Sequence, residues 1–142
     1  MNSTILSFNY RQTIIKEYNN WVVLLRPKQV TIGSLVIACK ESSESLADIT
    51  NEAHLELQNI IFETEKSLKE IFQFDKINYL ALMMVDKHVH FHVVPWYSKP
   101  INFNGSIHED KYWPFPPILT KNILFSSDDF ISLRKILIKH FK

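Results

Sequence analysis

The stretch His88–Pro95, HVHFHVVP, alternates histidine with apolar residues and is the most regular pattern in the chain. Successive side chains of a β-strand point to opposite faces of its sheet. A strand over this stretch therefore places His88, His90 and His92 on one face, with neighbouring imidazoles about 7 Å apart along the strand. The pattern predicts a strand that carries a row of three imidazoles.

Other apolar runs predict the strands that accompany it. β-Branched and apolar residues favour strands over Trp21–Leu25 and Ser34–Cys39, and a third apolar run covers Ile77–Val85. Only Asp86 and Lys87 separate the third run from the histidine stretch. We therefore expect a tight turn there, and an antiparallel hairpin between the two strands.

Helical spacing is found in two places. Apolar residues at helical intervals predict a long helix from about Asn51 to Gln73, with Thr50 as its N-cap. A final helix is expected after a cap at Ser126 or Ser127. Ahead of this final helix, the prolines within residues 96–125 predict an extended, irregular segment.

Several residues lie outside these regular patterns. Phe8–Tyr18 fits either a strand or an irregular helix. His54, His108 and His140 are isolated and are expected on the surface. Cys39, the only cysteine, is expected to be buried in a strand, and it excludes an internal disulfide.

Length and composition restrict the classes of function. The 142 residues, of which 46% are hydrophobic and 22% charged, fit a single domain over 1–142. Gly33 and Gly105 are the only glycines, which excludes the glycine-rich dinucleotide fingerprint and the Walker A phosphate loop. A net charge of +1 disfavours nucleic acid as the main partner.

The hydropathy pattern bears on location. No apolar run approaches the about 18 residues that a membrane span needs. The first residues lack the charged start and apolar run of a signal peptide. We therefore expect a cytoplasmic protein without a membrane partner.

A row of imidazoles is compatible with two kinds of chemistry. Histidines two residues apart on a strand bind zinc when a further ligand completes the site, but the outer pair of a straight row lies too far apart for one tetrahedral ion. Alternatively, a neutral imidazole is a nucleophile, and its neighbours donate hydrogen bonds to phosphoryl oxygens. The spacing favours phosphate chemistry over a metal, and over a polar edge strand without a chemical role.

The stretch His88–Val94 resembles the His-φ-His-φ-His-φ-φ signature, with φ apolar, of the histidine triad (HIT) family. The order of predicted elements over about residues 20–97, with Gly33 ahead of the second strand, is also similar. A later segment resembles the tail of a bacterial subgroup of the family through Phe103, Gly105, Trp113 and Pro114. The resemblance implies an α+β fold, in which an antiparallel sheet of about five strands packs against one long helix and is followed by a carboxyl-terminal helix. It also implies a homodimer.

The resemblance further implies roles for single residues. His90 is the expected nucleophile: it attacks the α-phosphate of a nucleotide and forms a nucleotidyl-histidine that water then hydrolyses. His88 and His92 orient this ring and contact phosphate oxygens, and Leu25 and Val36 lie near the base and ribose. Neither a cofactor nor a metal is implied. The expected substrate is a nucleotide or nucleoside phosphate, such as a phosphoramidate or a dinucleoside polyphosphate.

Some positions depart from the family pattern. Relatives usually carry a histidine where Ser42 or a neighbour stands, a phosphate donor at the position of Met84, and an arginine at that of Trp96. Lys87 or a partner chain is a candidate replacement donor. The departures leave a second hypothesis open, a non-catalytic nucleotide-binding or partner-binding module on the same fold.

Overall fold

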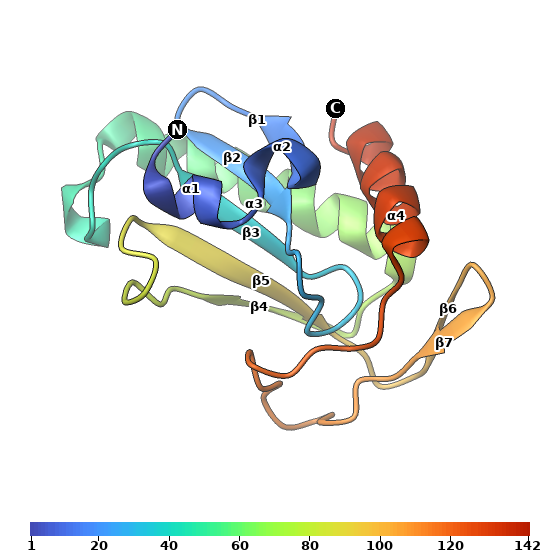
Figure 1. Cartoon of the computed structure of the whole chain (residues 1–142). Coiled ribbons are helices and arrows are strands. Elements are labelled where there is room, and N and C mark those ends of the chain that lie inside the picture. The colour runs from blue at the N-terminus through green and yellow to red at the C-terminus, as the bar shows by residue number, and fades with distance from the viewer.

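A five-stranded antiparallel sheet forms the centre of the computed structural model, which describes every residue from Met1 to Lys142 (Figure 1). Its strands, in the spatial order β1-β2-β3-β5-β4, are β1 (Ile14–Glu17), β2 (Trp21–Leu25), β3 (Leu35–Cys39), β4 (Lys76–Leu80) and β5 (His90–Trp96). A separate two-stranded hairpin consists of β6 (Ile101–Phe103) and β7 (Ser106–His108). The helices are α1 (Ser3–Ser7), α2 (Tyr10–Thr13), α3 (Asn51–Phe72) and α4 (Ser127–His140), with a short 3-10 helix at Leu46–Asp48. The predicted α+β architecture is confirmed.

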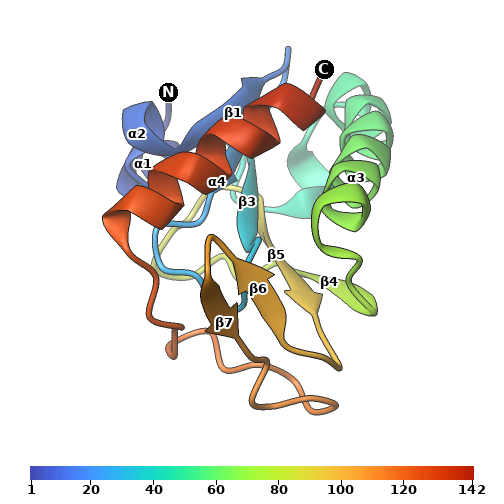
Figure 2. The same cartoon turned by 90° about the vertical axis from the view of Figure 1, so that its right-hand side faces the viewer.

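Helices cover both faces of the sheet. Figure 2 shows the sheet between α1 and α2 on one side and α3 on the other. Every residue of β2 and β3 is buried, which explains why their sequences are continuous apolar runs rather than alternating ones. The smaller of the two hydrophobic clusters, beneath α1, consists of Ile5, Val22, Leu24, Val36 and Ala38.

The predicted helices are confirmed with small changes at their ends. Thr50 caps α3, because its hydroxyl accepts from the backbone N–H of Ala53 at 3.2 Å, and α3 ends at Phe72. Ser126 rather than Ser127 is the N-cap of α4, because its hydroxyl accepts from the backbone N–H of Asp129 at 3.1 Å. Neither helix has the length and apolar character needed to cross a membrane.

The hairpin that carries the histidines is more open than predicted. β4 ends at Leu80 rather than Val85, and β5 begins at His90 rather than His88. The antiparallel pairing of the two strands is confirmed. Residues 81–89, however, form an irregular connection, so the prediction of a two-residue turn is wrong.

Hydrogen bonds join the end of this connection to other parts of the chain. The backbone N–H of His88 donates to Oγ1 of Thr4 at 3.1 Å, and that of Val89 donates to the carbonyl of Ser43 at 3.0 Å. Both acceptors lie outside β4, on α1 and in the loop after β3. These bonds anchor the connection to α1 and to the loop after β3, and the connection lacks the glycine that favours a tight turn.

Two segments contain regular structure that their sequences did not specify. Within residues 8–18, the short α2 runs directly into β1, so each of the two alternatives is right for part of the segment. Within residues 96–125, the β6–β7 hairpin interrupts the irregular chain. Gly105 stands at its turn with a φ of +85°, a backbone conformation that favours glycine.

The isolated histidines differ in their surroundings. His54 and His140 are exposed, and Cys39 is buried in β3, as expected. The prediction that His108 is exposed is wrong, because only 9% of its surface is accessible. Its ring lies against that of Phe125, with 5.4 Å between the ring centroids. The segment that leads into α4 therefore covers this histidine.

Candidate active site

His90 and His92 extend from β5 on one face of the sheet. Their register partners on β3 are Ala38 and Val36, two residues of the small cluster beneath α1. The two imidazoles meet edge to face, with 5.1 Å between their centroids. His88 precedes the strand and is half-buried. The structure thus brings two of the three predicted histidines together on the strand and places the third at its entrance.

A hydrogen bond determines which ring nitrogen of His90 carries the proton. Its Nδ1 lies 2.7 Å from the carbonyl oxygen of His88. Because a carbonyl oxygen only accepts, Nδ1 carries the proton, and the lone pair of the neutral ring is on Nε2. This Nε2 atom is buried and has no hydrogen-bond partner. A buried, unpartnered nitrogen is uncommon in a folded protein and marks a candidate reactive atom.

His92 is held as a neutral ring. The Nε–H of Arg26 donates to Nδ1 of His92 at 3.3 Å. Burial of the ring, followed by the charge of Arg26 and the proximity of His90, lowers the pKa of His92 to about 4, against a smaller opposing effect of Asp86. His92 therefore carries no charge near neutral pH.

His88 is connected to α1 through Thr4. Oγ1 of Thr4 lies 2.9 Å from Nδ1 of His88, and it also accepts from the backbone N–H of the same histidine. A second contact joins the neighbouring residues, since the hydroxyl of Ser7 donates to Asp86 at 2.8 Å. The amino-terminal helix is thus attached to the histidine stretch by polar contacts.

The same helix closes the site. The ring of Phe8, which follows α1 directly, lies 5.9 Å from His90 and 5.8 Å from His92, centroid to centroid. His90 has no accessible surface and His92 only 7%. A ligand that reaches Nε2 of His90 must therefore displace part of this cover.

Solved structures share this architecture. A histidine triad protein from Bradyrhizobium japonicum matches with a TM-score of 0.75 and 16% sequence identity, covering 100% of this chain and 97% of that one. A histidine triad protein from Sinorhizobium meliloti matches with a TM-score of 0.74 and 15% identity, covering 99% and 95%. A hypothetical histidine triad nucleotide-binding protein from Sulfolobus tokodaii matches with a TM-score of 0.72 and 18% identity, covering 97% and 91%.

This chain has the histidine triad fold. The matches span nearly the whole of each chain, but their identities are low, so they establish the fold and leave the activity to be argued from the site. No protein-family model matches the sequence, and no curated protein is significantly similar to it.

Within this histidine triad fold, the two predicted nucleotide contacts lie on different faces of the sheet. Val36 pairs in register with His92 and belongs to the cluster on the histidine face. Leu25 belongs to the larger cluster on the face of α3, away from the imidazoles. Both side chains are fully buried.

A small cavity of about 350 Å³ opens beside His88. It is lined by α1, by the loop after β3 and by the connection before β5, through Ser3, Thr4, Glu44, Val85, Asp86, Lys87 and His88. Lys87, the candidate replacement phosphate donor, lines this cavity together with His88. Its two carboxylate neighbours give the cavity a mixed charge.

The other positions that depart from the family pattern are not part of this cavity. Met84 is 82% exposed, and Ser42 is exposed in the loop after β3. Trp96 is half-buried at the far end of β5, where its indole Nε1 is buried without a partner.

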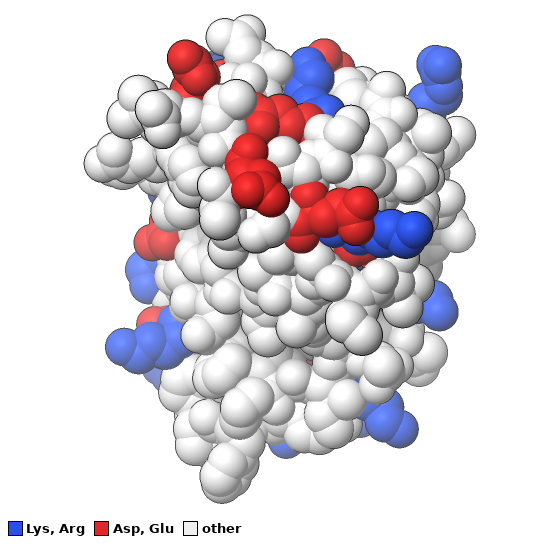
Figure 3. Space-filling view, turned by 90° about the vertical axis from the view of Figure 1, so that its left-hand side faces the viewer, with Lys and Arg blue, Asp and Glu red and all other residues white.

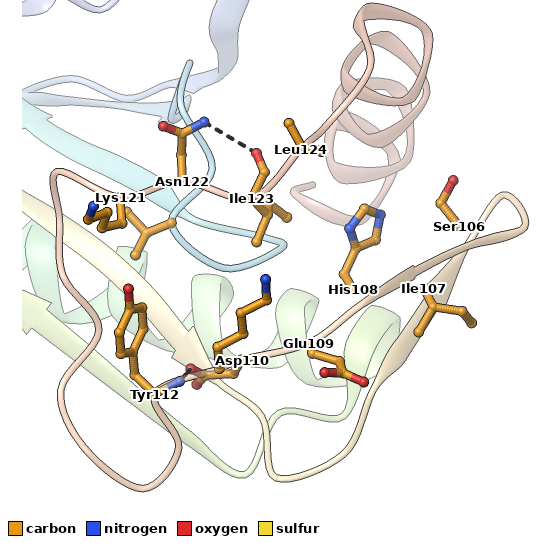
Figure 4. Close-up of a pocket in the computed structure, with 12 residues that line it drawn as sticks. Ser106, Ile107, His108, Glu109, Asp110, Tyr112, Lys121, Asn122, Ile123 and Leu124 are labelled. Atoms are coloured by element: carbon orange, nitrogen blue, oxygen red, sulfur yellow. Dashed lines mark hydrogen bonds between the residues drawn. The ribbon is translucent and has the colours of Figure 1, made fainter.

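A second cavity, of about 580 Å³, lies away from the triad (Figure 4). The β7 strand and the residues after it form one wall, residues 121–124 form the other, and Val30 also lines the cavity. His108 lines it, and burial lowers the pKa of this histidine. None of the triad histidines lines this cavity.

Two site residues escaped sequence reasoning, Thr4 and Arg26. Neither lies in the histidine stretch, and they precede His88 and His92 by 84 and 66 positions. The only sequence signal is indirect, because Arg26 directly follows a strand in a chain with few arginines. Spacing rules do not detect contacts of this kind.

Metal-ligating side chains do not cluster in this chain. No three His, Cys, Asp or Glu side chains are grouped so that they could share a metal ion. On the face shown in Figure 3, acidic side chains gather in the upper half, and basic side chains lie beside them and along the margins without forming a cluster. This face offers no continuous basic surface for a polyanion such as a nucleic acid.

Proposed function

We propose that the protein belongs to the HIT family and is a nucleotide hydrolase or nucleotidyl transferase that cleaves at the α-phosphate. The observation that carries the proposal is the state of His90. Its Nδ1 proton is engaged by the carbonyl of His88, and its Nε2 lone pair has no partner. A neutral imidazole with its proton held on Nδ1 and an unprotonated, unpartnered Nε2 is a competent nucleophile.

The reaction has two displacement steps. Nε2 of His90 donates its lone pair to the α-phosphorus, and a P–N bond forms as the bond to the leaving group breaks. The leaving group departs with the bonding electrons and takes up a proton. Water then attacks the same phosphorus and breaks the P–N bond, which releases the nucleoside monophosphate and restores the lone pair on Nε2. Two moderate barriers replace one high barrier.

The flanking histidines stabilise the phosphoryl group in this proposal. His92 is neutral, so it donates a hydrogen bond without adding charge next to the nucleophile. His88 lines the small cavity together with Lys87, whose ammonium supplies positive charge for further phosphates. Val36 contacts the nucleoside on the histidine face, whereas Leu25 supports the sheet from the other side.

The substrate class follows from the site. A mononucleotide linked through its α-phosphate to an amine or to a second nucleotide supplies the required phosphorus and a leaving group. We therefore expect a nucleoside phosphoramidate or a dinucleoside polyphosphate, handled without a cofactor.

The test is a replacement of the nucleophile. His90→Ala should abolish turnover of adenosine phosphoramidate and diadenosine polyphosphates, with an unchanged circular dichroism spectrum. Mass spectrometry of the quenched wild-type reaction should find a nucleotidyl group on the peptide that contains His90. His54→Ala, at an exposed position of α3, is the matched control. Undiminished hydrolysis by His90→Ala rejects the role of His90.

A second candidate function is supported by the closed site. Because His90 has no accessible surface, the fold also suits a non-catalytic nucleotide-binding or partner-binding module. Tight binding of AMP or GMP without turnover across the substrate panel would favour this alternative. A trapped adduct on His90 excludes it.

We also propose a cytoplasmic homodimer. β4 is the edge of the sheet and pairs only with β5. Leu55 and Phe62 of α3 are 70% and 72% exposed, seven positions apart and hence on one side of the helix. Tyr79 of β4 donates to Glu65 of α3, so this side of the helix adjoins the open edge. A second copy would cover the apolar residues and the edge together.

A further inference from the structure

Arg26 determines where the proton of His92 lies. Its Nε–H donates to Nδ1 of His92 at 3.3 Å. A guanidinium has no acceptor and keeps its protons at ordinary pH, so Nδ1 must accept. The proton of the neutral imidazole is therefore on Nε2.

The guanidinium that imposes this arrangement is itself fixed. Its two Nη atoms donate to the carbonyl oxygens of Lys28 and Leu119. The carbonyl of Arg26 accepts from the side chain of Gln29 at 2.7 Å, and Gln29 is 99% buried. Neither ion pair of the chain includes Arg26, so a carboxylate does not neutralise its charge. The donor to His92 thus has a fixed place and a full charge.

Thr4 likewise determines where the proton of His88 lies. The hydroxyl oxygen accepts the backbone N–H of His88 at 3.1 Å and lies 2.9 Å from Nδ1 of that residue. Thr4 is 98% buried, and Nδ1 is the acceptor within reach of its hydroxyl proton. If Nδ1 carried a proton, the hydroxyl oxygen would accept from both N–H groups of His88, and the buried hydroxyl proton would lose its acceptor. The neutral ring of His88 therefore also has its proton on Nε2.

We propose that Arg26 and Thr4 are positioning residues that hold both outer imidazoles of the triad as Nε2–H donors. His90 has the opposite tautomer, with Nδ1–H towards a carbonyl and a lone pair on Nε2. The triad then presents one nucleophilic nitrogen and two neutral donors. This arrangement suits an anionic phosphoryl group, because the lone pair attacks the phosphorus while the two N–H groups donate hydrogen bonds to its oxygens.

The expected effect of Arg26 and Thr4 on catalysis rests on the proposed nucleotidyl transfer at His90. The tautomers assigned to His88 and His92 do not depend on that proposal. The titratable and charged groups that act on His92 are Arg26, His90 and Asp86. Arg26 and His90 oppose its protonation, and Asp86 favours it. Loss of the guanidinium should therefore free the tautomer and make the ring easier to protonate.

The first test is the tautomeric state of the wild-type protein. Two-bond ¹H–¹⁵N spectra of histidine-labelled protein at pH 7.5 distinguish the two nitrogens of each ring. We expect Nε2–H for His88 and His92 and Nδ1–H for His90. A protonated Nδ1 on His88 or His92 in the wild type overturns the proposal without any variant.

The second test uses substitutions at the two positioning residues. Arg26→Met should give His92 a mixture of tautomers and move its titration midpoint to higher pH. Arg26→Lys should keep the midpoint closer to that of the wild type, because it retains the positive charge. Thr4→Val should change the state of His88 alone, and Thr4→Ser should preserve it. The spectrum of exposed His54 is the internal control. A single, unchanged His92 tautomer and midpoint in folded Arg26→Met contradicts the role of Arg26.

Kinetics separates this proposal from the proposed function. Arg26→Met and Thr4→Val should each lower kcat at least tenfold with little change in KM, while Thr4→Ser should stay near the wild type. If the wild type turns over no substrate, the proposed function fails, but the tautomer spectra still decide the positioning roles. If His90 is essential while both variants keep full kcat, the positioning roles fail alone.

Discussion

At the scale of single residues, hydrogen-bond partners distinguish three chemically identical side chains. A backbone carbonyl directs the Nδ1 proton of His90, whereas Arg26 and Thr4 contact the Nδ1 atoms of His92 and His88. An imidazole has two exchangeable sites, so its neighbours rather than its own chemistry decide which nitrogen donates. The function proposed for the triad depends on these partners as much as on the three histidines.

The lowered pKa of His92 predicts a pH-dependent stability. The pKa is about 4 in the folded chain and 6.5 ordinarily, so between these values the unfolded chain binds more protons. The contribution of His92 to the free energy of unfolding is therefore fully present above about pH 6.5, and it is lost as the pH falls towards 4. Between pH 7.5 and pH 5 the contribution of His92 to the loss is about 2 kcal/mol.

Urea unfolding at these two pH values measures the effect. Other groups also titrate in this range, so the comparison is with His92→Gln, which removes this one contribution. The variant should lose about 2 kcal/mol less than the wild type between pH 7.5 and pH 5. Equal losses in the two proteins would contradict the assigned state of His92.

At the scale of elements, the short α1 and the residue after it control access to the site. Thr4 and Ser7 make polar contacts with the histidine stretch and the connection before it, and Phe8 covers two imidazoles. A helix this short is not stable alone, so its position depends on these contacts. The element that completes the triad is thus also the one that must move for a substrate to enter.

We predict that Phe8→Ala opens the site. Removal of the ring should increase the rate at which diethylpyrocarbonate modifies His90, measured by mass spectrometry of the peptide, at least fivefold. It should also lower the free energy of unfolding by about 2 kcal/mol, because Phe8 packs on the cluster beneath α1. Leu6→Ala, at a 57% exposed position of the same helix, should change neither quantity much. Equal modification of His90 in both variants would show that α1 does not limit access.

At the scale of the whole molecule, the turn between β2 and β3 packs directly on α3. Gly33 has a φ of +89°, and a Cβ atom there would lie 3.1 Å from the ring of Phe72 and 3.3 Å from Leu68. Gly105 has a similar φ of +85° but no atom within 4 Å of the corresponding position. The two glycines therefore share a backbone requirement and differ in tertiary packing.

This difference predicts unequal effects of the same substitution. Gly33→Ala and Gly105→Ala should both lose stability because an L-residue is strained at positive φ. Gly33→Ala should lose about 1–3 kcal/mol more, because its methyl group also crowds the side chains of Phe72 and Leu68. Thermal and urea unfolding of the two variants provide the measurement. Equal losses would mean that α3 adjusts freely.

The proposed dimer gives a second prediction at this scale. Phe62→Glu should convert a dimer into a monomer, because it places a charge in an apolar contact. Light scattering after size exclusion measures the mass, and Ile131→Glu, at a 54% exposed position of α4, is the control. A monomeric wild type at tens of micromolar would reject the interface.

Much of the fold could be predicted from the sequence because its signals are local. The helical spacing and cap of α3, the apolar runs of β2 and β3, and the alternation within β5 depend on residues close together in the chain. The ends of the histidine hairpin could not be predicted in this way. His88 and Val89 donate their N–H groups to Thr4 and Ser43, and a local pattern does not contain these partners.

The same division applies to the site. By itself, the sequence determined that three imidazoles recur at the period of a strand, since this period is a property of the extended backbone. Only the tertiary structure decided which nitrogen of each ring is free, because Arg26 and Thr4 reach His92 and His88 from distant segments. It also decided that His90 is buried beneath Phe8, because burial depends on how the amino-terminal residues pack on the finished sheet.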